Sequence, residues 1–145
     1  MILPLSQAVE ENWFDDMLKR PVSEHPLVIE IKLEGEWIAV GDCGFHNLDR
    51  RVCAAEVGIF IGEKKYWNQG YGTEVMQLLL RHGFQTLNLN RIALLVFETN
   101  PGAIRAYEKA GFVREGIQRE AMYKNGRYID VIGMSVLRSE WKERG

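Results

Sequence analysis

The chain has 145 residues, a net charge of −2 at pH 7, 46% hydrophobic and 26% charged residues, which are ordinary values for one globular domain. The apolar content excludes a disordered chain, and the longest apolar run, Ile92 to Phe97, is far shorter than the ~18–20 residues that cross a bilayer. The slightly acidic balance argues against nonspecific nucleic-acid binding, and the first residues lack the basic and apolar regions of a signal peptide. We therefore expect a cytoplasmic protein that binds neither nucleic acid nor membrane.

The two cysteines, Cys43 and Cys53, belong to no CxxC motif and have no histidine cluster nearby. A structural zinc site needs four ligands, so we expect no metal. Disulfides are rare in the cytosol, which favours two reduced thiols.

The first half of the chain predicts one helix and three strands. Apolar residues spaced i, i+4, i+5 and i+8 predict a helix from about Ser6 to Lys19, with Pro21 beyond its end. Runs of apolar and β-branched residues predict strands over Pro26–Leu33, Trp37–Phe45 and Val52–Ile61. The polar segment 46–50 predicts a hairpin turn, and a turn centred near Leu48 would place Cys43 opposite Cys53.

The second half alternates helices and strands. A helix is predicted from Thr73 to about Thr86, with one apolar face formed by Val75, Leu78, Leu79 and His82. The apolar segment Arg91–Glu98 does not alternate, which indicates a central strand. Asn100 is a favourable N-cap, and Gly111 is a favourable stop for the helix that follows it.

The last predicted elements are two strands, Phe112–Glu120 and Tyr128–Leu137, joined at the hairpin signal Asn125-Gly126. The resulting order is α-β-β-β-α-β-α-β-β. This order predicts the α+β class, with a mixed, largely antiparallel sheet flanked by helices.

The segment Trp67–Thr73 (WNQGYGT) places two glycines between a strand and a helix. Such a loop either holds a phosphate on the free amides of the helix start or is merely a tight turn. A Walker A loop is excluded because Gly72-Thr73-Glu74 lacks the lysine. A Rossmann fingerprint is excluded because Val75 stands where its third glycine belongs.

The helix after Asn100 carries Ala103, Tyr107 and Ala110 on one face. Small alanines beside a tyrosine leave room for a ligand to pass close to the helix. The alternative is an ordinary packed helix with Tyr107 in the core.

Together these segments resemble the GNAT superfamily of acetyl-CoA-dependent N-acetyltransferases, closest to the branch with ribosomal-protein N-terminal and spermidine acetyltransferases. The resemblance covers about residues 26–138 and rests on AEVGIFIG (55–62), WNQGYG (67–72), N-x-x-A-x-x-x-Y-x-x-x-G-F (100–112) and KNGRYIDVIGMSVL (124–137). It implies a single acetyltransferase domain over residues 1–145 with the acyl-CoA N-acyltransferase fold. Family members usually carry a further strand and helical residues before the strand at Pro26, so we expect an N-terminally short version.

The resemblance also implies where acetyl-CoA binds. Main-chain amides of the glycine loop would hold the CoA pyrophosphate, the strand at 59–61 would pair with pantetheine, and Asn100 would contact the cofactor arm. The implied cofactor-binding residues are Ile59, Phe60, Ile61, Trp67, Asn68, Gln69, Gly70, Tyr71, Gly72, Thr73 and Asn100. Trp67 stands where the family usually has arginine or glutamine, which leaves the amides intact but puts a side-chain contact there in question.

For catalysis, the resemblance implies that Tyr107 protonates the departing CoA thiolate, a role within reach of a well-placed phenol. Glu56 lies fourteen residues before Gly70, the spacing of the base glutamate in some family members. The alternatives are that Glu56 is a structural or solvated carboxylate, that Glu98 is the base, or that water serves. A backbone amide at a strand splay would polarise the thioester carbonyl, and Gly58 stands where a bulge suits such a splay.

We therefore expect direct transfer of acetyl from acetyl-CoA to a primary amine, such as a protein N-terminus, a polyamine or another small amine. The alternative is a non-catalytic CoA-binding or interaction module. The acidic residues Glu24, Glu30, Glu34, Glu36 and Asp42 either favour a cationic acceptor or form a solvated face. The three histidines, His25, His46 and His82, are interpreted as surface or packing residues. We also consider a homodimer, in which a partner covers an exposed sheet edge.

Overall fold

Six strands and two α-helices form the part of the chain that the computed structural model describes, residues 26–67 and 69–141. The strands are β1 (Leu27–Leu33), β2 (Glu36–Asp49), β3 (Ala54–Ile61), β4 (Arg91–Phe97), β5 (Val113–Lys124) and β6 (Arg127–Leu137). The helices are α2 (Tyr71–Arg81) and α3 (Pro101–Ala110), with a 3₁₀ turn at Lys64–Tyr66 and a π-helical turn at His82–Thr86. The helix predicted over residues 6–19 lies outside the described residues.

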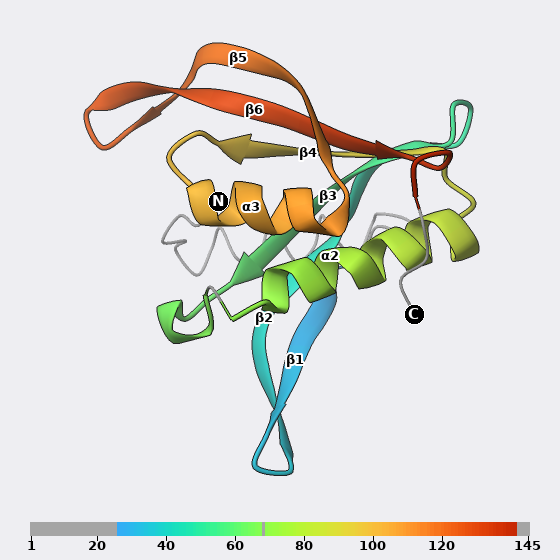
Figure 1. The fold of residues 1–145 in the computed structure, drawn as a ribbon, viewed down its shortest axis with the longest axis vertical. Coiled ribbons are helices and arrows are strands. Elements are labelled where there is room, and N and C mark those ends of the chain that lie inside the picture. Colours follow the sequence, from blue (N-terminus) through green and yellow to red (C-terminus); the bar gives the residue numbers. More distant parts are fainter. Residues whose placement is uncertain (1–25, 68, 142–145) are drawn as a thin grey trace, which may run out of the picture.

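The strands form one sheet in the order β1-β2-β3-β4-β6-β5. All neighbouring strands are antiparallel except β3 and β4, which are parallel. The β1–β2 hairpin extends from one edge of the sheet and the β5–β6 hairpin from the other (Figure 1). The α+β class and the mixed, largely antiparallel sheet are therefore confirmed.

Both helices lie side by side on one face of the sheet (Figure 1). The core between the layers is formed by apolar side chains, including Val57, Ile92, Leu94, Met134, Met76, Leu80, Phe84 and Ile104. We call the sheet face turned away from α2 and α3 the second face. No helix within residues 26–67 and 69–141 combines the length and apolar character needed to span a bilayer.

The α2 segment differs from its prediction in its start and in its buried face. The helix begins at Tyr71, and residues 82–86 continue it as a π-helical turn. Its buried residues are Met76, Leu79 and Leu80, whereas Leu78 is 55% exposed. Leu78 was wrongly assigned to the apolar face because the buried stripe follows helical spacing from Met76, through Leu79 and Leu80 to Gly83 and Phe84.

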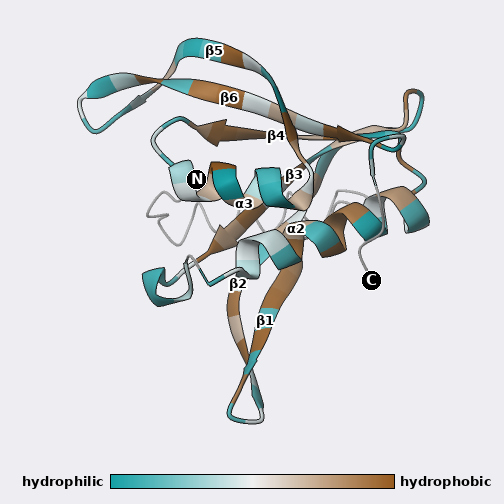
Figure 2. Ribbon diagram, in the orientation of Figure 1, coloured by the Kyte–Doolittle hydropathy of each residue, from teal (hydrophilic) through white to brown (hydrophobic). Residues whose placement is uncertain are grey.

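Strand β4 is central, as predicted, because β3 and β6 flank it. The lack of alternation in its sequence did not mean burial on both faces. Ile92, Leu94 and Val96 are buried under the helices, whereas Leu95 is 56% exposed on the second face (Figure 2 shows the apolar colour along the strand).

The hairpin between β2 and β3 turns later than the sequence predicted. Strand β2 continues to Asp49, which pairs with Ala54, and Cys43 faces Ile59. The expected pairing of Cys43 with Cys53 is therefore wrong, and both thiols are free. The cause is an irregularity in the ladder between His46 and Asp49, which carries β2 past the predicted turn. One consequence of this register is that His46 lies opposite Glu56.

Candidate functional site

Strands β3 and β4 are paired over only three residues and then part. The pairs are Ala54 with Arg91, Ala55 with Ile92, and Glu56 with Ala93, and no later pair joins the two described strands. Strand β2 stays paired with β3 as far as Ile61, so the gap opens on the β4 side of β3. Main-chain groups of β3 beyond Glu56 thus face a gap instead of a neighbouring strand, which suits pairing with an extended ligand.

The predicted pantetheine residues Ile59, Phe60 and Ile61 all lie in this parted segment. The predicted bulge at Gly58 is wrong, because Gly58 pairs regularly with Gly44. Strand β3 stays in regular register with β2 through Gly58, so β4 leaves β3 without a bulge in β3.

The glycine loop presents amides at the start of α2 that have no acceptor among the described residues. Gly70 is the N-cap in the left-handed region, with φ of 83°, and no side chain within residues 26–67 and 69–141 caps the helix. The first helical bond runs from the Glu74 amide to the Gly70 carbonyl at 3.1 Å, so the preceding amides are left for another acceptor. A Cβ at Gly70 would meet no atom within 4 Å, so there is open space beside these amides. Free amides, a positive helix end and this space fit a pyrophosphate.

Side chains fix the loop to its surroundings. The Trp67 indole Nε1 donates to the carbonyl of Ile61 at 2.9 Å, which ties the loop to the end of β3. The Thr73 hydroxyl donates to the Ala106 carbonyl at 3.2 Å, which ties the start of α2 to α3. Trp67 stands where the family usually has arginine or glutamine, and here its side chain anchors the loop to β3. Asn68 lies outside the described residues, Gln69 is exposed, and the rings of Tyr71 and Tyr66 pack 6.5 Å apart.

Helix α3 supplies Asn100 and Tyr107. Asn100 is the N-cap, as predicted, and its Oδ1 accepts from the Ala103 amide at 3.2 Å. Tyr107 is half-buried, with its ring edge-on to Phe112 at 6.1 Å between centroids. Burial raises the pKa of Tyr107 to about 12, so its hydroxyl keeps its proton at neutral pH. Tyr107 therefore packs against the core, as the ordinary packed-helix interpretation expected, and it still retains partial exposure.

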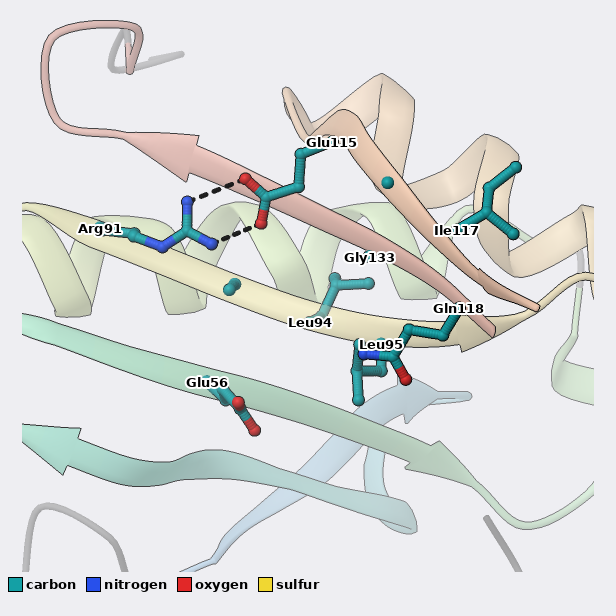
Figure 3. A pocket seen from close by; sticks show the side chains of 10 residues that line it. Glu56, Arg91, Leu94, Leu95, Glu115, Ile117, Gln118 and Gly133 are labelled. Atoms are coloured by element: carbon teal, nitrogen blue, oxygen red, sulfur yellow. Dashed lines mark hydrogen bonds and ion pairs between the residues drawn. The ribbon is translucent and has the colours of Figure 1, made fainter. Parts of the chain in front are cut away.

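A cavity of about 310 Å³ lies on the second face, over strands β3, β4, β6 and β5 (Figure 3). Leu95 and Ile117 give it apolar walls, and Glu56, Arg91 and Glu115 bring charge. Arg91 forms a two-point ion pair with Glu115 (Figure 3), and the Ser135 hydroxyl donates to the same carboxylate at 3.1 Å. The hydrogen bonds from Arg91 lower the pKa of Glu115.

Glu56 lies at the point where the strands part, and it lines the cavity. Its Oε2 accepts from Asn47 Nδ2 at 3.1 Å and lies 3.1 Å from His46 Nε2. From the sequence, His46 was interpreted as a surface or packing residue, because its contact with Glu56 depends on the β2–β3 register. Glu98, the competing base, accepts from the Asp130 amide at 3.3 Å and follows the last residue of β4.

The two predicted catalytic residues lie on opposite faces of the sheet. Tyr107 packs with the core on the helix side. Along β3, Ala55 and Val57 are buried under the helices, so Glu56 between them points to the second face. Glu56 also belongs to the last β3–β4 pair, so it lies at the start of the gap between the two strands.

The predicted acidic surface is only partly near this gap. Glu30, Glu34 and Glu36 are exposed on the β1–β2 hairpin, and Glu24 lies outside the described residues. Asp42 pairs with Phe60 and, by strand alternation, shares the second face with His46. Among the residues that the structure describes, no three His, Cys, Asp or Glu side chains gather as metal ligands would.

Comparison with protein families gives a match to the family described as Acetyltransferase (GNAT) domain, over residues 2–113. Among curated relatives, the uncharacterized N-acetyltransferase p20 of Bacillus licheniformis is 36% identical over 102 residues, 70% of this chain and 57% of that protein. A spermidine N(1)-acetyltransferase of Vibrio cholerae is 37% identical over 91 residues, 63% of this chain and 52% of that protein. The chain spans little more than half the length of these relatives.

Among solved structures, the spermidine N-acetyltransferase of Vibrio cholerae in complex with CoA and spermine is similar to this chain. Its TM-score is 0.84 at 28% identity, over 96% of this chain and 80% of that one. The expected acyltransferase architecture is therefore confirmed.

Proposed function

The chain belongs to the GNAT acetyltransferase domain family, and on that premise we propose that it transfers acetyl from acetyl-CoA to a primary amine. The observation that carries this proposal is the gap between β3 and β4, which has the glycine loop beside it. Tyr107 lies on one side of the sheet and Glu56 on the other, so an acid and a base approach the gap from opposite faces. We also propose that residues 1–145 act as a single domain in the cytoplasm.

Two parts of the chain hold the cosubstrate in this proposal. Amides around residues 69–73 hold the pyrophosphate, because no acceptor in the described part of the chain occupies them and they lie at the positive end of α2. The parted edge of β3 at 59–61 pairs with the extended arm, and Asn100 contacts it from the start of α3. When bound, acetyl-CoA supplies the acetyl group as a thioester.

The two catalytic side chains divide the proton transfers. Glu56 takes the proton that the amine loses as the new C–N bond forms, and Tyr107 donates to the sulfur as the C–S bond breaks. With a pKa of about 12, Tyr107 is a far weaker acid than a thiol, whose ordinary pKa is about 8.5. Its first contribution is therefore a hydrogen bond to the sulfur, with proton transfer late in bond cleavage.

The cavity on the second face supports a primary amine as the acceptor. Glu115 is already neutralised by Arg91, whereas the described side chains that contact Glu56 are His46 and Asn47, both at its Oε2. A carboxylate at the end of the gap attracts an amine, and Leu95 and Ile117 give its carbon chain an apolar wall. The spermine bound in the structural neighbour makes a polyamine the first acceptor to test, and a peptide with a free N-terminus the second.

The direct test measures thiol release from acetyl-CoA with a panel of polyamines, peptides and small amines. We expect release with at least one primary amine, and Tyr107→Phe to lower kcat by about 100- to 10,000-fold with CoA affinity nearly unchanged. Tyr128→Phe is the matched control, because Tyr128 is 61% exposed on the β5–β6 hairpin. CoA binding without turnover on any amine would instead favour a non-catalytic CoA-binding module.

A further inference from the structure

His46 and Glu56 face each other across strands β2 and β3, in register and on the second face. His46 Nε2 lies 3.1 Å from Glu56 Oε2. A carboxylate oxygen only accepts hydrogen bonds, so Nε2 carries the proton in this contact. The neighbouring Asn47 donates from Nδ2 to the same oxygen at 3.1 Å. Two donors from one strand thus hold one oxygen of Glu56.

The backbone makes room for this arrangement. A Cβ built on Gly58 would lie 3.7 Å from His46 Cε1, in ordinary van der Waals contact. The imidazole therefore lies along β3, beside Gly58 and next to Glu56, at the place where β4 diverges. A long side chain at position 58 would have to share that space with the imidazole.

The charged groups around the pair are engaged with one another. On β2, Asp49 is bonded to Arg51. Across the cavity, Arg91 on β4 is bonded to Glu115 on β5. The contacts of the Glu56 carboxylate with the described side chains therefore come from His46 and Asn47.

From this geometry we propose that His46 is a positioning residue for the acetyl transfer. Its Nε2–H fixes Oε2 of Glu56, so that Oε1 is left to take the proton of the incoming amine. This inference rests on the proposed function, because it assumes that Glu56 is the base. Both side chains are about two-fifths exposed, at 42% and 40%, so without the histidine the carboxylate would sample other rotamers in water.

Three variants test the proposal through kinetics. His46→Ala removes the donor and lowers kcat about 10-fold, the effect of one hydrogen bond to a charged group in a partly exposed site. His46→Gln keeps an amide N–H near the position of Nε2 and restores kcat to within about 3-fold of the parent. In the Glu56→Gln background, His46→Ala has no further effect, because the carboxylate that it positions is gone.

Binding and folding measurements accompany the kinetics. The Kd for CoA stays unchanged in the His46 variants, since the histidine contacts Glu56 and not the glycine loop. His82→Gln is the matched control, because His82 packs near Phe45 at 6.0 Å between ring centroids, on the helix side. Its kcat equals that of the parent, and thermal unfolding shows that every variant is folded.

The outcomes separate this proposal from the proposed function. If Glu56→Gln is slow but His46→Ala matches the parent, the positioning role of His46 is wrong and the base role of Glu56 stands. If His46→Gln is as slow as His46→Ala, or the two losses multiply in the double variant, positioning through the donor is also wrong. If Glu56→Gln turns over normally, the base assignment fails and the role of His46 fails with it.

Discussion

The two faces of the sheet are built by different means. On the helix side, the glycine loop, the Asn100 cap and Tyr107 each follow from a short local pattern. On the second face, Glu56 acquires His46 and Asn47 from β2, and the ion pair of the cavity joins β4 to β5 across β6. The difference teaches that the proposed cofactor side is specified by sequence motifs, whereas the proposed acceptor side is specified by strand register.

The largest expected effect is a loss of CoA affinity when the glycine loop on the helix side is altered. Gly70→Asp places a carboxylate beside the amides at the start of α2, so CoA affinity falls by about 100-fold or more. Gly35→Asp is the matched control, because Gly35 has a φ of 82° with nothing within 4 Å of a Cβ, close to Gly70 at 83°. Both substitutions bear similar backbone strain, and isothermal titration with CoA separates them. Equal affinity in the two variants would remove the loop from pyrophosphate binding.

A second effect concerns the half-buried phenol of Tyr107. Burial raises the pKa of Tyr107 to about 12 from its ordinary value of 10.0, so the unfolded chain releases this proton first as pH rises. The stabilisation that the neutral phenol gives is complete below pH 10 and is lost progressively as pH rises toward about 12, a loss of about 2 kcal/mol.

Denaturant unfolding of the parent and of Tyr107→Phe measures this loss. The parent loses about 2 kcal/mol more than the variant between the two pH values, whereas exposed Tyr128→Phe behaves like the parent. Parallel curves for the parent and Tyr107→Phe would show that the phenol titrates like an exposed one.

A smaller effect, on the free energy of unfolding, is expected from the ion pair on the second face. Arg91→Ala removes the ion pair with Glu115, whose side chains are 39% and 40% exposed, so the cost is no more than about 1 kcal/mol. The Arg91 hydrogen bonds lower the pKa of Glu115, so their contribution is present at neutral pH and is lost as pH falls through the lowered pKa. Urea unfolding at neutral and acidic pH should show the difference shrinking in acid. Glu63→Ala, which breaks the exposed pair with Lys65 outside the cavity, is the control.

The smallest effect concerns the thiols, which the sequence placed opposite each other. Cys43 is buried, and burial raises its pKa to about 11, so it resists alkylation in the native state. Cys53, in the β2–β3 turn, is half-exposed and should react first. Mass spectrometry after brief labelling should find the modification on Cys53, and on both cysteines in denaturant. Rapid native labelling of Cys43 would contradict the β2 register.

The same contrast explains how far the sequence predicted the structure. The Asn100 cap and the Asn125-Gly126 turn depend on residues a few positions apart, and helix α3 and strand β6, which they precede, are where they were expected. The bounds of their neighbours were less accurate, because α2 begins two residues early and β5 continues four residues past its predicted end. The turn of the β2–β3 hairpin was misplaced by about three residues, which moved Cys43 away from Cys53 and His46 opposite Glu56. A polar stretch does not show where a ladder with an irregularity will close.

The site shows the same division. The resemblance carried by the motifs predicted the roles of Tyr107 and the loop, but it did not predict the partners of Glu56, because they come from a neighbouring strand. The apolar run of β4 did not show that one face of the strand is buried and the other exposed, since both buried Leu94 and exposed Leu95 are leucine. In the sequence, His46 could be recognised only as a polar residue near the predicted turn. Its position opposite Glu56 follows only from the correct β2–β3 register.

The most direct test of the account is a crystal structure of the chain with CoA and a polyamine. The account predicts the pyrophosphate on the amides of residues 69–73 and the sulfur in the gap beyond the Glu56–Ala93 pair, within hydrogen-bond reach of the Tyr107 hydroxyl. It also predicts the amine on the second face, beside Oε1 of Glu56. A sulfur outside the gap, or an amine reaching it from the helix side, would contradict the division of the site between the two faces.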